Sequence, residues 1–192
     1  MSKEQRAEGR EVQRLKTPLS EGNIKGLRAG DRVLLSGTIY TVRDASHKKI
    51  LSELKEGTAA PFDMRGQVIY YTGPCPAKPG EVIGSIGPTT SLRMDRYTPA
   101  MLELGIKGLI GKGSRSREVR DATVKHKAVY LLAVPGVAAA QTRYIKEAEI
   151  IAYPELGTEA VHKLVVKDFP LFVANDIYGQ DIFETERAKW KS

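Results

Sequence analysis

The chain has 192 residues, 41% of them hydrophobic, a formal net charge of +7 and one cysteine, Cys75. A single cysteine excludes an intrachain disulfide framework and any iron–sulfur cluster held by this chain alone, because such clusters need three or four thiolates. The positive charge raises nucleic acid, a membrane surface and acidic small molecules as partners. Because the basic residues are spread along the chain, without an RNP-like motif or zinc-finger spacing, we favour a solvated basic surface and expect no nucleic acid.

No segment of the sequence has the features of a targeting or membrane-spanning sequence. Residues 1–16 are charged and lack an apolar stretch, and no run of about eighteen apolar residues occurs anywhere. We therefore expect a cytoplasmic protein that does not enter a membrane. Without internal repeats or low-complexity linkers, we predict one domain at residues 17–192, preceded by a charged extension at residues 1–16 that is disordered or helical.

The predicted elements alternate between apolar strands and amphipathic helices, which indicates a mixed α/β class. In chain order they are a short helix capped by Ser20, a strand at 32–40, a helix at 43–56, a strand at 67–72, a short strand at 81–86, a helix at 90–104, a strand at 108–110, a helix at 116–126, a strand at 128–134, a small-residue helix at 137–146, strand regions at 148–153 and 161–172, and a terminal helix at 180–191.

Two loops concentrate hydroxyls and cations on backbone that can approach a ligand, namely residues 84–95 and 111–113. Glycine lets main-chain amides come close to an oxyanion, and the hydroxyls of Thr89 and Thr90 are suited to capping the helix that follows. Both loops lie at the C-terminal ends of predicted strands, where ligands bind in sheets backed by helices. The pattern favours half of a binding site for a small dianion.

Three cations suit that dianion, because Arg43 closes the first long strand and joins Arg93 and Lys112 from the two loops. Each guanidinium can hold a carboxylate through two parallel hydrogen bonds, while the lysine provides a point charge. From spacing alone, however, we favour the alternative, in which each cation pairs with a surface carboxylate. His47 is a candidate general base, but we favour a structural role in which it orders Asp44 or a main-chain carbonyl. The run at residues 111–117 has the composition of a phosphate-binding loop without the Walker spacing.

At these residues the chain resembles the β subunit, equivalent to the C-terminal domain, of class I iron–sulfur fumarases and L-tartrate dehydratases. The resemblance extends over about residues 17–184. The segments that carry it are residues 18–20, 30–31, 35–47, 71–74, 87–95 and 111–113.

The resemblance implies a swivelling β/β/α domain in which a barrel-like mixed sheet is flanked by helices. It also implies a hetero-oligomer with an α subunit whose three cysteines hold a four-iron four-sulfur cluster, which acts on the substrate as a Lewis acid. In this scheme the chain is part of a hydro-lyase that is active only with that α subunit. It binds neither the cluster nor another metal by itself.

Carried over by motif position, Arg43, Arg93 and Lys112 hold the substrate carboxylates, and Thr89 exchanges the proton at the carbon next to a carboxylate. Thr90, His47 and Asp44 are supporting candidates. The motif at residues 89–90 and the overall likeness favour fumarate and L-malate, with L-tartrate as the alternative substrate. A competing interpretation from another class is a non-catalytic protein that binds anions or nucleic acid through the same basic loops.

Overall fold

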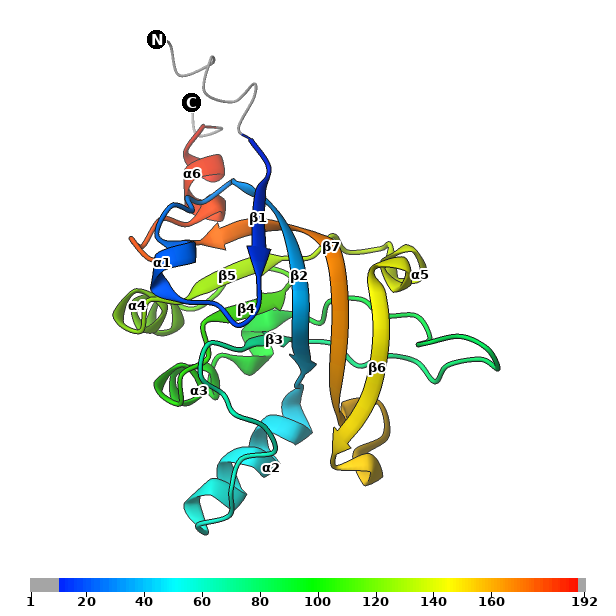
Figure 1. The fold of residues 1–192 in the computed structure, drawn as a ribbon. Coiled ribbons are helices and arrows are strands. Elements are labelled where there is room, and N and C mark those ends of the chain that lie inside the picture. Colours follow the sequence, from blue (N-terminus) through cyan, green and yellow to red (C-terminus); the bar gives the residue numbers. More distant parts are fainter. Residues whose placement is uncertain (1–10, 190–192) are drawn as a thin grey trace.

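Strands far apart in the sequence close into a barrel, as the computed structural model, which describes residues 11–189, shows (Figure 1). The strands are β1 (Gln13–Lys16), β2 (Arg32–Thr41), β3 (Val68–Tyr70), β4 (Gly108–Gly111), β5 (Val129–Leu132), β6 (Ile145–Ala152) and β7 (Val161–Asn175). β2, β3, β4 and β5 are parallel neighbours, and β7 pairs antiparallel with both β5 and β2. These five strands make the closed barrel, which β1 extends beside β2 and β6 beside β7.

Helices and short helical turns connect the strands, and one helix, α6, follows the last strand. They are α1 (Glu21–Ile24), α2 (Asp44–Lys55), η2 (Ser91–Met94), α3 (Thr98–Glu103), α4 (Arg117–Lys125), α5 (Ala138–Gln141), η3 (Thr142–Tyr144), η4 (Pro154–Glu159) and α6 (Ile182–Lys189). Figure 1 shows α2, α3 and α4 on one side of the barrel, whereas the long connection between β3 and η2 projects beyond β6 on the other. The predicted mixed α/β class and helix-flanked, barrel-like sheet are confirmed.

The core divides according to the alternation of side chains along the strands. On β3, Val68 and Tyr70 belong to the cluster that includes Phe169 of the antiparallel strand β7, and this cluster fills the barrel. Ile69, between them, packs instead with residues of α2 and α3, such as Ile50 and Met101. The apolar faces of both helices thereby hold the outside of the parallel strands.

The N-terminal prediction was wrong over the last four residues of the charged segment. Gln13–Lys16 form β1, which pairs in parallel with residues 33–36 of β2, and only Leu15 of the four is buried. β1 lies at the edge of the sheet, and only one of its side chains is buried. Such a short edge strand has no recognisable alternation of apolar and polar residues, so the sequence did not predict it. Residues 1–10 of the predicted extension lie outside the described part of the chain.

The helix predicted at residues 90–104 is divided into η2 and α3. The interruption lies at Asp95, whose carboxylate turns inward and accepts hydrogen bonds from Arg115 Nε at 2.7 Å and from the Ser116 amide at 2.6 Å. Pro99 then occupies the first turn of α3, where a proline is well tolerated. Arg93 therefore lies at the end of a short 3₁₀ turn.

Two further elements differ from the sequence predictions. The helix predicted at residues 137–146 ends early, because Ile145 packs into the barrel and pairs with Val166 of β7. The strand predicted at residues 81–86 does not form. That segment belongs to the projecting connection, where no neighbouring strand forms a ladder with it and single bonds such as Cys75 N–H to Ser85 O hold the chain.

Candidate functional site

Three parallel strands deliver the candidate residues to one edge of the barrel. β2 ends just before Arg43, β3 runs into residues 71–73, and β4 ends at Gly111, just before Lys112. Because these strands are parallel neighbours, their carboxyl ends lie together. The Lys112 loop therefore follows a strand as predicted, whereas the loop at residues 84–95 does not, because the strand predicted at residues 81–86 does not form.

Thr89 and Lys112 are joined by main-chain hydrogen bonds. The Thr89 amide donates to Tyr71 O at 2.7 Å, and the Lys112 amide donates to Thr89 O at 3.4 Å. The Ser91 amide completes the pairing with a 3.0 Å bond to Lys112 O, and Thr90 and Lys112 form a parallel bridge. The loop that carries Thr89 thus continues the sheet as a neighbour of the Lys112 loop.

The absence of a side chain at Gly111 permits this close approach. A Cβ atom built there would lie 1.9 Å from Ser91 Oγ and 3.0 Å from the Tyr71 ring. The buried phenol of Tyr130 on β5 then bonds both loops, lying 2.9 Å from Ser91 Oγ and 2.8 Å from Gly113 O. Burial raises the pKa of Tyr130, so the phenol stays neutral and keeps its proton for this link.

Arg43 lies between an acidic residue and the backbone of a neighbouring loop. Its Nη2 is 3.3 Å from Glu159 Oε1, and about a fifth of each side chain is exposed. A Cβ atom at Gly73 would come within 2.9 Å of Arg43 Nη1 and 2.6 Å of Thr158 O. Glycine at position 73 therefore lets the β3 loop pack against the guanidinium.

Asp44 places Arg93 next to Arg43. Arg93 Nη2 donates to Asp44 Oδ2 at 2.9 Å, and the same oxygen is 4.0 Å from Arg43 Nη2. The Arg93 side chain is 54% exposed, and its bond to Asp44 uses one of its five N–H donors. Asp44 thus gathers two of the predicted carboxylate-binding cations at the start of α2.

His47 is fully buried behind these residues. Its Nδ1 lies 2.7 Å from Arg43 O, and because a carbonyl only accepts, Nδ1 carries the proton. The ring stacks on Tyr97 at 5.4 Å, and Nε2 is buried without a hydrogen-bond partner. Desolvation lowers the pKa of His47 to about 4, against the opposing effect of the bond to Arg43 O. This geometry fits the structural role favoured for His47, in which it orders a main-chain carbonyl.

Arg115 does not face a ligand, although it lies in the run that resembles a phosphate-binding loop. Its side chain is completely buried and pairs with Asp95, donates from Nη2 to Thr98 Oγ1 at 2.7 Å, and lies over the rings of Tyr71 and Tyr130. Arg115 therefore fastens the loop after Lys112 to the segment after Arg93, as part of the frame beneath the site.

The donor set of this chain does not fit a resident iron–sulfur cluster. The one cysteine, Cys75, is exposed on the projecting connection. Within residues 11–189, no three His, Cys, Asp or Glu side chains come together in a way that would hold a metal ion. No helix in this range has the length and apolar character of a transmembrane span.

The structure therefore assembles the predicted residues into two adjoining groups. Main-chain bonds join Thr89, Thr90 and Lys112, and ion pairs join Arg43, Asp44 and Arg93. Residues 71–73 connect the groups, since they contact Arg43 on one side and accept the Thr89 amide on the other. The sequence predictions did not include the supporting residues Glu159, Arg115 and Tyr130.

Comparison with known proteins agrees with this arrangement. The family model described as fumarase C-terminus matches residues 1–186. The chain is 41% identical to fumarate hydratase 2 of Leishmania major and 40% identical to the aerobic class I fumarate hydratase of Escherichia coli K12, in each case over 80% of the chain and 28% of the relative. It is 33% identical to the β subunit of the L(+)-tartrate dehydratase of the same bacterium, over 88% of the chain and 85% of the relative.

The chain thus spans less than a third of the two fumarate hydratases but most of the tartrate dehydratase subunit. The name of that subunit implies a partner subunit in the relative. The resemblance inferred from the motifs is confirmed. Because the family model matches nearly the whole chain and covers both candidate loops, the chain belongs to the fumarase C-terminus family.

Proposed function

We propose that this chain is the β subunit of a class I fumarate hydratase, which interconverts fumarate and L-malate together with an iron–sulfur α subunit. The single observation that carries the proposal is the placement of Thr89 and Lys112 as main-chain neighbours beside the Arg43–Asp44–Arg93 group. This arrangement offers three cations and one hydroxyl to a four-carbon dicarboxylate.

Arg93 and Arg43 bind substrate carboxylates in this proposal. Arg93 keeps exposed donors beyond its bond to Asp44, and Arg43 is held with little freedom between Glu159 and the backbone at Gly73. A guanidinium that is already oriented loses less side-chain entropy when it binds a carboxylate. The two arginines therefore fix the orientation of the dicarboxylate.

Thr89 exchanges the proton at the carbon next to a carboxylate. It takes up this proton when L-malate loses water and returns it when fumarate is hydrated. A threonine hydroxyl is a weak base in water, but nearby positive charge favours the alkoxide. Lys112 supplies that charge from the neighbouring loop and also stabilises the negative charge that develops on the substrate carboxylate as the proton leaves.

The remaining parts of the proposal concern partner and setting. We propose that the α subunit supplies the four-iron four-sulfur cluster, in keeping with the single cysteine of this chain. The two subunits form a hetero-oligomer in the cytoplasm, where the reaction serves the fumarate-to-malate step of the tricarboxylic acid cycle. The β subunit alone is then inactive.

The test is the absorbance of fumarate under anaerobic conditions, measured for the chain alone, for its complex with the α subunit, and for complexes that carry Thr89→Ala or Thr58→Ala. Thr58 is an exposed threonine in the loop after α2 and serves as the matched control. We expect Thr89→Ala to lower kcat by at least about 100-fold, the usual loss when a general acid–base group is removed. Activity of the isolated chain, or full activity of the Thr89→Ala complex, contradicts the assignment.

A second candidate function is L-tartrate dehydration, favoured by the match to a separately encoded β subunit over most of its length. Tartrate is also a four-carbon dicarboxylate, and the same cations suit it. Assay of both substrates with one purified complex decides between the two functions. Salt-sensitive binding of the chain to DNA or RNA, without assembly with an α subunit, would instead support a non-catalytic binding protein.

A further inference from the structure

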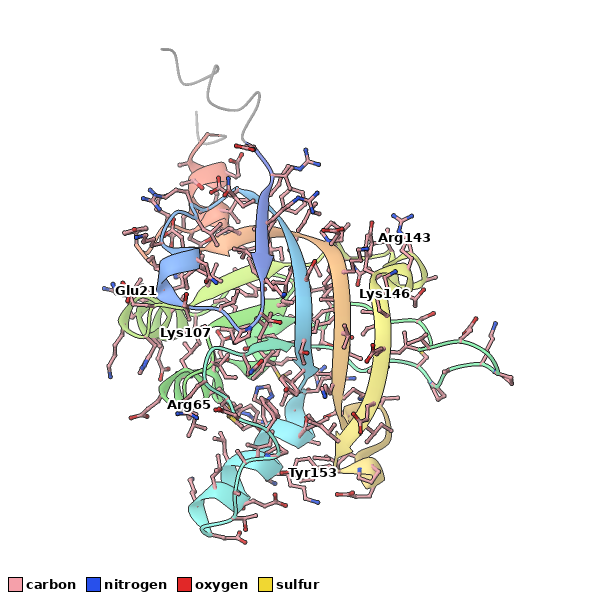
Figure 2. The ribbon with its side chains drawn as sticks, viewed as in Figure 1. Glu21, Arg65, Lys107, Arg143, Lys146 and Tyr153 are labelled. Atoms are coloured by element: carbon pink, nitrogen blue, oxygen red, sulfur yellow. The ribbon has the colours of Figure 1, made fainter. Side chains whose placement is uncertain are left out.

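The turn η4 lies along one face of α2. The Tyr153 hydroxyl donates to Glu53 Oε2 at 2.6 Å, and Lys49 of the same helix pairs with Glu155 and lies 4.6 Å above the Tyr153 ring. Figure 2 labels Tyr153 at this position, between α2 and the end of β6. Side chains therefore fasten η4 to the helix that begins next to Arg43.

Glu159 makes the next contact along this face. Ala45, Lys49 and Glu53 follow one another at intervals of four residues and so share one face of α2. Glu159 Oε2 accepts the Ala45 amide at 2.7 Å, in the first turn of the helix, where main-chain donors lack helical partners. The docking of η4 thus brings a carboxylate to the N-terminus of α2.

The two oxygens of this carboxylate have different partners. While Oε2 is fixed by the Ala45 amide, Oε1 lies 3.3 Å from Arg43 Nη2. The guanidinium meets the loop at Gly73 through Nη1, and both members of the ion pair are about four-fifths buried. Arg43 is therefore held by an anion that is itself held by the main chain.

We propose that Glu159 is a positioning residue for Arg43 and through it determines how tightly the site binds a dicarboxylate. This inference rests on the proposed function, in which Arg43 binds a substrate carboxylate. Glu159 holds the guanidinium in one orientation before the substrate arrives, so less freedom is lost on binding. Glu159 does not act on the reacting atoms.

Two other roles for Glu159 predict different results. If Glu159 only docks η4 on α2, its replacement acts like that of Glu155, which contacts the same helix away from Arg43. If Glu159 acts only as a competing anion near the substrate, its removal strengthens dianion binding. A positioning role predicts weaker dianion binding, and only at Glu159.

The experiment compares Glu159→Gln with Glu155→Gln in the complex with the α subunit. Glutamine keeps an oxygen for the Ala45 amide but loses the charge that holds Arg43. We expect Glu159→Gln to raise the KM for fumarate about tenfold with little change in kcat, and Glu155→Gln to leave both unchanged. Binding of succinate, a dicarboxylate that does not react, should weaken by the same factor in calorimetry.

The Arg43→Ala background tests whether Glu159 acts through the arginine. There, Glu159→Gln should cause no further loss of succinate affinity, because the group that it positions is absent. An unchanged or lower KM for Glu159→Gln, equal effects of the two glutamine variants, or additive losses with Arg43→Ala overturn the inference. A wild-type complex without activity on fumarate instead overturns the proposed function, so the two failures are distinguishable.

Discussion

Acidification should destabilise this protein through His47. The imidazole is fully buried between Tyr97 and Tyr71, its Nδ1–H donates to Arg43 O, and Arg115 opposes its protonation while Asp44 favours it. Burial is the largest effect and lowers the pKa of His47 to about 4 in the folded protein. In the unfolded chain the imidazole titrates near its ordinary value of about 6.5.

The sign follows from the proton balance. Between about pH 6.5 and 4 the unfolded chain binds a proton at His47 that the folded chain does not, so the free energy of unfolding falls as the pH falls through this window. Above about pH 6.5, His47 is neutral in both the folded and the unfolded chain, so the free energy of unfolding no longer changes with pH through this residue. With these two pKa values, the shift from pH 7.5 to pH 5 costs about 2 kcal/mol from this one residue.

The assay is urea unfolding of the wild-type chain and the His47→Phe variant at four pH values between 7.5 and 5. Phenylalanine keeps a flat ring against Tyr97 but does not titrate, and Arg43 O keeps the backbone amide of residue 47 and Ser46 Oγ as donors. Other groups, including the half-buried His162, titrate alike in both proteins. Between pH 7.5 and pH 5, the free energy of unfolding of the wild type should fall by about 2 kcal/mol more than that of the variant. Parallel losses in the two proteins would refute the reasoning.

Three other predictions concern the frame and the site. Gly111→Ala should cost about 1–3 kcal/mol in urea unfolding, because the new Cβ meets Ser91 Oγ at 1.9 Å; Ser91→Ala in the same chain should restore part of the loss, and no destabilisation would contradict this packing. Asp95→Asn should cost about 3 kcal/mol or more, since it leaves the buried Arg115 guanidinium without its counter-charge; a loss below about 1 kcal/mol would argue against a buried ion pair. Arg93→Lys should raise the KM for fumarate about tenfold while assembly with the α subunit survives, because lysine keeps the charge but loses the two-pronged grip, and an unchanged KM would count against this role.

Local sequence patterns predicted the elements that carry their own signals. Ser20 is the N-cap residue of α1, and its main-chain amide donates to Asn23 Oδ1 at 2.8 Å. Apolar runs bounded by turns identified β2, β3, β4 and β5, and helical spacing identified α2 and α4. Since Lys112 directly follows β4, its place at this edge was predictable from the order of strands and helices. Thr89 reaches the same edge through main-chain bonds to Tyr71 and Lys112, after a connection in which the predicted strand does not form.

The unpredicted features depend on partners far away in the sequence. Glu159 is 116 residues from Arg43, and it lies on a turn whose glycine and proline favour no regular element. Asp95 interrupts a helical pattern only because Arg115 draws its carboxylate into the core. Neither the pair of Glu159 with Arg43 nor that of Asp95 with Arg115 follows a regular spacing in the sequence. The order of charged residues along the chain therefore does not indicate which cations are exposed at the candidate site and which are buried beneath it.

The candidate site is held by two kinds of anchor, and they differ in how they respond to substitution. Thr89 and Lys112 are positioned by main-chain bonds to each other and to Tyr71, so a change of side chain at either residue leaves the backbone pairing in place. Arg43 and Arg93 are positioned by carboxylates, and Asp44 lies within 4.0 Å of both guanidinium groups. Because the two arginines share Asp44, a change at one ion pair alters the charge and the position of the other. In the proposed function, the position of Thr89 therefore tolerates changes in neighbouring side chains, whereas the binding of dicarboxylates depends on the balance of charge at the start of α2.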